Sequence, residues 1–153
     1  MWEDEDDDDG GGFDPGEEGK NFEALPIYKK ALEILDLTEQ IVDTFGDESL
    51  AKRHRESMLE DAMILPAKIA GAEAMDYYVH KMENATVVKI HARSLLTQTA
   101  SIKYLGLVNE QYVQLLRDEI EVFRLLFKEW VKTFDINTTK EGDGWGLFVS
   151  DDE

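Results

Sequence analysis

Apolar residues recur every three or four positions along the chain between residues 25 and 134, a spacing typical of helices with one buried face. The first helix should begin near Leu25-Pro26, because the N–H that proline lacks would have no partner in a first helical turn. Gly46-Asp47 should end it. Its expected buried stripe consists of Ile27, Ala31, Ile34, Leu35, Thr38, Ile41, Val42 and Phe45.

The same spacing predicts three more helices. The second is expected from about Glu48 to about His80, and the third from about Asn84 to Tyr104. Leu105-Gly106-Leu107 then offers glycine at the position where a helix end favours a left-handed residue. Asn109 is a good N-cap for a fourth helix, which should run from Glu110 to about Phe134.

Short connections between long amphipathic helices favour antiparallel neighbours. No segment alternates apolar and polar residues in the manner of a strand. The predicted fold class is therefore all-α, an antiparallel up-down four-helix bundle over residues 22–135. Residues 1–21 are interpreted as an acidic glycine-rich tail, and residues 136–153 as a largely irregular glycine-rich tail with an apolar cluster. The expected core includes Ile69, Leu95, Phe123 and Trp130.

Charge is concentrated at the two ends. The formal net charge is −18, and residues 1–20 hold ten acidic residues and one lysine. Residues 136–153 hold five acidic residues and one lysine, which leaves nineteen acidic and fourteen basic residues for 21–135. Because affinity for nucleic acid comes mainly from Lys and Arg on phosphates, nucleic acid is not an expected partner.

One basic run, Lys52-Arg53-His54-Arg55, has three interpretations. It forms a solvated helical face balanced by nearby carboxylates, or it receives an acidic tail from the same or an adjacent chain, or it contacts RNA. Lys52, Arg53 and Arg55 are candidate interaction residues in the second and third cases.

Aromatic residues interrupt both tails. Trp2 and Phe13 either lie in a solvated tail or anchor it on a neighbouring surface. The C-terminal cluster, by which we mean Trp145, Leu147, Phe148 and Val149, would lower solubility if it stayed exposed. We therefore expect these four residues to dock on the chain's own bundle or a neighbouring one, or failing that, on a partner protein.

No reactive constellation emerges from the residue types. The chain has no cysteine, no histidine with Glu or Asp three positions earlier, and no Gly-x-Ser-x-Gly. We expect no catalytic residue, no cofactor and no formed metal site, with diffuse weak calcium binding at Asp4–Asp9 as the most that spacing allows. No apolar run approaches 18 residues and the N-terminus is acidic, so neither a membrane span nor a secretory signal is expected, and the cytoplasm is the expected location.

Several motifs carry a family resemblance. They are Leu25-Pro26-Ile27-Tyr28-Lys29-Lys30-Ala31, Leu65-Pro66-Ala67-Lys68-Ile69-Ala70, Leu95, Thr97-Gln98, Lys103, Leu105-Gly106-Leu107-Val108, Tyr112 and Trp130-Val131-Lys132-Thr133-Phe134. In this order and spacing, residues 22–134 resemble the four-helix-bundle family of proteins encoded within 23S rRNA intervening sequences and of accessory variability proteins of diversity-generating retroelements. The resemblance implies a homo-oligomer, typically a pentamer, without known catalytic activity.

The chain departs from that family in its basic surface. Leu59 and Glu60 stand where such proteins often carry a basic pair. The leading hypothesis is therefore a non-catalytic, homo-oligomeric scaffold or protein-interaction protein. The alternatives are a nucleic-acid-associated accessory factor and, third, a small-molecule or metal-binding bundle. Self-association is also favoured by apolar residues too widely spread around the fourth helix for one narrow stripe, namely Tyr112, Val113, Leu116, Val122, Leu125 and Phe127.

Overall fold

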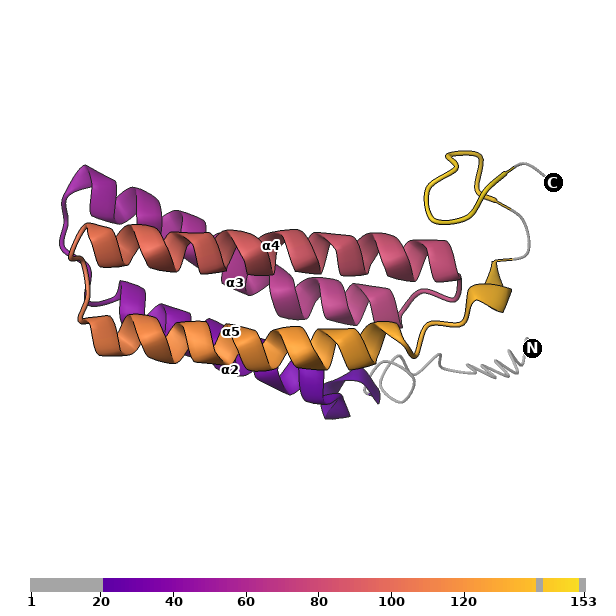
Figure 1. Ribbon diagram of the computed structural model, residues 1–153, viewed down its shortest axis with the longest axis horizontal. Helices are drawn as coiled ribbons and strands as arrows, with labels where there is room; N and C mark the ends of the chain where they lie inside the picture. The colour runs from indigo at the N-terminus through magenta and orange to yellow at the C-terminus, as the bar shows by residue number, and fades with distance from the viewer. Residues whose placement is uncertain (1–20, 140–141, 152–153) are drawn as a thin grey trace, which may run out of the picture.

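A computed structural model describes residues 21–139 and 142–151 of the chain. Its α-helices are α2 (Pro26–Val42), α3 (Ser49–Glu73), α4 (Tyr78–Tyr104) and α5 (Glu110–Val131). Two short 3₁₀ helices, η1 (Asn21–Ala24) and η2 (Ile136–Thr138), flank the four long helices (Figure 1). The described residues contain no strand, which confirms the predicted all-α class.

The four long helices form an up-down bundle. Contacts join α2 to α3, α3 to α4, α4 to α5, and α5 back to α2, so the ring of helices is closed. The connecting turns alternate between the two ends of the bundle, which makes each helix antiparallel to the next (Figure 1). This is the arrangement that the short connections predicted.

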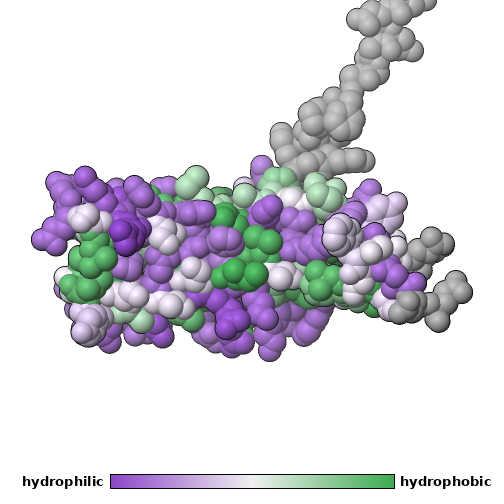
Figure 2. Space-filling view, turned by 90° about the horizontal axis from the view of Figure 1, so that it is seen from above, coloured by the Kyte–Doolittle hydropathy of each residue, from purple (hydrophilic) through white to green (hydrophobic). Residues whose placement is uncertain are grey.

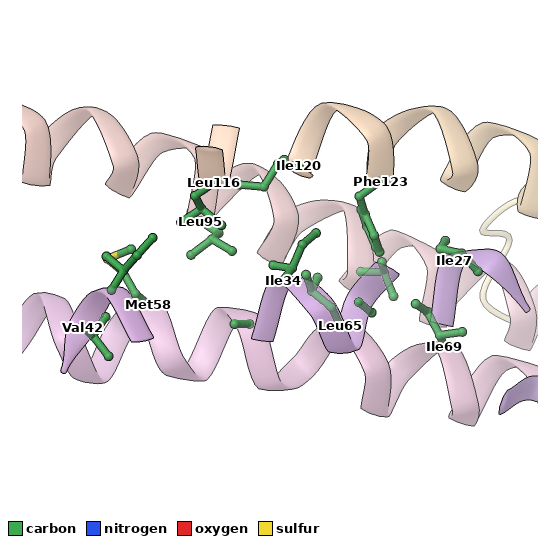
Figure 3. Close-up of a cluster of buried hydrophobic side chains, with 14 of the residues drawn as sticks. Ile27, Ile34, Val42, Met58, Leu65, Ile69, Leu95, Leu116, Ile120 and Phe123 are labelled. Atoms are coloured by element: carbon green, nitrogen blue, oxygen red, sulfur yellow. The ribbon is translucent and has the colours of Figure 1, made fainter. Parts of the chain in front are cut away.

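The core lies along the axis of the bundle and receives side chains from all four helices (Figure 3). The stripe predicted for the first helix is buried, apart from the half-buried Leu35, and its last residue, Phe45, lies in the turn after α2. The four predicted core residues belong to one buried cluster and have the following exposed fractions: Ile69 0%, Leu95 0%, Phe123 1% and Trp130 4%. The core prediction is confirmed.

The predicted signals between α4 and α5 form the expected caps. Gly106 has a φ of 65°, and its N–H donates to the carbonyl of Lys103 while the N–H of Leu107 donates to the carbonyl of Ile102. This pair of bonds is the Schellman motif, which satisfies carbonyls at a helix end. The Asn109 side chain accepts a hydrogen bond from the N–H of Gln111 at 3.0 Å.

The boundary between the second and third predicted helices was wrong. Helix α3 ends at Glu73, and α4 already begins at Tyr78. Val79 explains part of the difference, because it is 1% exposed and buries the first turn of α4. The rest of the explanation is a cap from far along the chain: the hydroxyls of Thr138 and Thr139 accept from the N–H groups of Tyr78 and Val79, at 2.8 and 3.3 Å.

Candidate protein-interaction surfaces

Helix α5 exposes a row of apolar side chains to solvent. The exposed fractions are 52% for Tyr112, 46% for Leu115, 43% for Val122 and 50% for Leu125. Intervals of three and seven residues keep them on one side of the helix, and we call these four residues the α5 stripe. Val113 and the other inward residues of α5 are buried on the opposite side, so the prediction that its apolar residues do not share one stripe is confirmed.

The α5 stripe continues into the seam between α2 and α5. A hollow of about 310 Å³ lies there, and its walls include Leu37, Ile41 and Tyr112. Farther along the seam, the Lys30 ammonium donates to the Glu119 carboxylate at 2.7 Å. That carboxylate, with a smaller effect of Glu33, raises the pKa of Lys30 above its ordinary value. The ion pair therefore weakens only at a pH above the ordinary pKa of lysine.

A second surface lies between α4 and α5, which run next to each other (Figure 1). It is a groove of about 320 Å³ with an apolar floor and a charged rim. The floor residues are Ala92, Leu96, Ile120, Phe123 and Phe127. The rim residues are Lys89, Arg93, Arg117, Arg124, Lys128 and Glu121. We call this surface the basic groove, since five cations surround it and only one carboxylate does.

Most of the rim cations have no carboxylate partner among the described residues. Arg124 pairs with Glu121 at 2.6 Å on the surface, and this guanidinium lowers the pKa of the Glu121 carboxyl. Arg117 donates to the neutral hydroxyl of Thr99 at 2.9 Å. The described residues place no acidic group against Lys89, Arg93 or Lys128. The basic groove is therefore an electropositive apolar surface on a strongly acidic protein.

The predicted basic run divides into two parts. Arg55 donates to the carbonyls of Val42, Phe45 and Gly46, at 3.2, 3.1 and 3.4 Å. Its guanidinium thus closes the turn after α2, and its role as an interaction residue stays a prediction. Lys52 and Arg53 are exposed and stay candidate interaction residues.

The C-terminal cluster does not pack on its own bundle. Exposed fractions are 87% for Trp145, 53% for Leu147 and 41% for Phe148, and only Val149 is half-buried. The segment folds locally, with the Asp151 carboxylate accepting from the N–H of Gly144 at 2.9 Å. Docking on the chain's own bundle was therefore wrong, while docking on a neighbouring bundle or a partner protein stays a prediction.

Sequence reasoning missed a polar cluster between α3 and α4. Asp61 is 5% exposed. Its carboxylate lies 2.8 Å from Nδ1 of His91 and accepts from the amide of Gln98 at 2.6 Å. The imidazole of His91 on α4 thus bridges to Asp61 on α3. The signal was present in the spacing: Asp61 follows Met58 by three positions and precedes Leu65 by four, which places it in the buried stripe of α3.

Figure 2 shows that the side viewed from above is mostly hydrophilic, with apolar patches at its centre and at one end.

Within the described ranges, no three histidine, aspartate or glutamate side chains gather as a metal site would require. None of the described helices combines the length and apolar character needed to cross a bilayer.

Comparison with known proteins adds no assignment. No protein-family model matches the chain, and no curated protein matches it in sequence. The resemblance to the intervening-sequence and accessory variability proteins thus stays a prediction that rests on the motifs themselves.

Proposed function

We propose that this protein is a non-catalytic scaffold that self-associates through the α5 stripe. The observation that carries the proposal is the row of four apolar side chains, each 43–52% exposed, on a helix whose other side fills the core. Large apolar patches on a protein surface mark places where another surface binds. A second copy of the chain presents the same stripe and is the partner that is always available.

The α5 stripe supplies part of the free energy that association requires. Covering the exposed half of four large apolar side chains contributes about 3–6 kcal/mol per chain. Lost translational and rotational freedom costs about 4–15 kcal/mol, so the stripe needs help from neighbouring contacts. The hollow between Leu37 and Tyr112 adjoins the stripe and adds apolar area to such a contact.

A pentamer, the state that the family resemblance favours, requires a second contact patch on each chain. A ring with an odd number of copies repeats one heterologous contact, so each chain presents two different patches. The α5 stripe supplies one patch. Met63 on α3 and Ile90 on α4, each 57% exposed, are candidates for the other.

Placing charge in the stripe should dissociate the protein. We expect light scattering to give several multiples of 17.5 kDa for the natural chain, with five copies favoured. The double variant Val122→Glu/Leu125→Glu should instead give a single chain mass, because two carboxylates on each chain would be buried in an apolar contact without counter-charges. Circular dichroism should show unchanged helix content, since both positions face solvent.

A matched control adds the same two charges elsewhere. Thr97→Glu/Gln114→Glu places carboxylates at exposed positions of α4 and α5 outside the stripe, and its mass should equal that of the natural chain. A natural chain that is monomeric at micromolar concentration would overturn the proposal. Equal dissociation of both double variants would show that net charge, and not the stripe, controls assembly.

The exposed C-terminal cluster should contribute to the assembly. Deleting residues 142–153 removes Trp145, Leu147, Phe148 and Val149, and we expect a lower melting temperature for the oligomer with the same helix content. Burying even two of these side chains contributes about 3–6 kcal/mol before ordering costs. The measurement is thermal unfolding by circular dichroism at two protein concentrations. Identical mass and melting temperature in the two chains would show that the cluster is only solvated.

A further inference from the structure

The basic groove combines two features that together select one kind of ligand. Its floor is apolar and includes the half-buried side chains of Leu96 and Phe127, while Lys89, Arg93 and Lys128 stand on the rim without acidic partners among the described residues. Five of the sixteen lysines and arginines of the chain line this one surface. A ligand that satisfies both features is a peptide with a large apolar side chain beside a run of carboxylates.

The chain contains such a peptide. Trp2 is followed by seven consecutive acidic residues, Glu3–Asp9. The indole would cover the apolar floor, and the carboxylates would face the cations. The C-terminal segment matches the groove less well, because Trp145 is flanked by glycines and residues 136–153 hold only five acidic residues.

The segment between Trp2 and the first helix is long enough for this contact to form within one chain. Trp2 is nineteen residues before Asn21, where the described structure begins, and nineteen extended residues span about 60 Å. The longest helix, α4, has 27 residues and is about 40 Å long. Trp2 can therefore reach the groove around the end of the bundle, and Gly10–Gly12 lie between the acidic run and the first helix.

We propose that residues 2–9 bind in the basic groove of their own chain, with Trp2 on the floor between α4 and α5 and the acidic run along Lys89, Arg93 and Lys128. This inference is independent of the proposed self-association, because the groove and the α5 stripe involve different residues of α5. Its consequence is that an external acidic ligand gains access to the groove only by displacing the chain's own segment.

The test uses a fluorescent peptide of residues 1–20 and a chain that begins at residue 21. We expect the peptide to bind the shortened chain, and to bind the full-length chain about tenfold more weakly, because a tethered segment at millimolar effective concentration competes with a ligand whose dissociation constant is about 0.1 mM. Binding should fall steeply with salt, since the Debye length shrinks from about 30 Å at 0.01 M to about 3 Å at 1 M. The peptide variant Trp2→Ala should bind more weakly at every salt concentration.

Two triple variants of the shortened chain locate the site. Lys89→Gln/Arg93→Gln/Lys128→Gln should reduce peptide binding at least tenfold. Lys52→Gln/Arg53→Gln/Lys68→Gln removes the same charge from exposed positions of α3 and should leave binding within about twofold. All six positions are exposed, so helix content should not change in either variant.

Each alternative result overturns the proposal. Absence of peptide binding to the shortened chain means that the groove does not take this segment. Equal affinity for the shortened and full-length chains excludes docking within one chain. A larger loss in the α3 variant moves the site to the Lys52-Arg53 run. Displacement of the peptide by a single-stranded RNA of equal charge that binds more tightly would assign the groove to nucleic acid.

Discussion

Replacing Phe123 by alanine should lower the free energy of unfolding by about 3–5 kcal/mol. The ring is 1% exposed and belongs to the cluster that joins all four helices (Figure 3). Removing it leaves a void between α5 and the other helices, which can close only if the helices shift together. The cost therefore combines the lost burial of the ring with the lost contacts of the residues around the void.

Chemical denaturation of the natural chain and the variant measures this difference. Leu32→Ala is a suitable control, because Leu32 is an equally apolar side chain on α2 but is 44% exposed, and its loss should cost less than about 1 kcal/mol. A loss below about 1 kcal/mol for Phe123→Ala would show that this side of α5 is not part of the core. The measurements should be made at one protein concentration, because self-association adds to apparent stability.

Local patterns were sufficient to predict the four helices and their buried sides. Apolar spacing located the stripe of α2, and Gly106 with Asn109 marked the connection between α4 and α5 within a few residues. These signals act over one or two helical turns, so they can be read without knowledge of the fold. The start of α4 could not be read in this way, because Thr138, sixty residues later in the chain, provides its cap.

The candidate surfaces differ in the same way, because one can be predicted from local sequence and the other cannot. The α5 stripe follows from the sequence of one helix, since Val122 and Leu125 cannot lie on the same side as the buried Val113. The basic groove does not, because Lys89 lies on α4 and Lys128 on α5, and only packing brings them to one rim. Surfaces built from two helices depend on crossing geometry and rotation, which a single sequence does not specify.

Replacing Asp61 by alanine should also have a large effect, with a loss of about 3 kcal/mol of stability. The Asp61 carboxylate accepts from Gln98 at 2.6 Å and lies 2.8 Å from the ring nitrogen of His91. Hydrogen bonds to a charged group contribute about 1.5–3 kcal/mol each, and a buried partner left without one carries its full desolvation penalty. Both partners would lose their acceptor between α3 and α4.

A matched surface pair separates burial from the chemistry of the bond. The Gln114 amide donates to the Asp118 carboxylate at 2.8 Å, four residues apart on the exposed side of α5. Asp118→Ala removes the same kind of hydrogen bond where water replaces it, so we expect a loss of less than about 0.5 kcal/mol. Similar losses at Asp61 and Asp118 would contradict a special role for the buried cluster.

A triple replacement then tests whether the cluster stabilises the bundle or only specifies how α3 and α4 meet. The side-chain amide oxygen of Gln98, Oε1, is buried without a hydrogen-bond partner among the described residues. The cluster therefore contains one buried acceptor without a hydrogen bond. Asp61→Leu/His91→Phe/Gln98→Leu removes every polar group together, and well-packed apolar replacements of buried polar clusters are often neutral or stabilising. We therefore expect the triple variant to recover most of the stability that Asp61→Ala loses. A triple variant as unstable as Asp61→Ala would show that the polar contacts themselves hold α3 against α4.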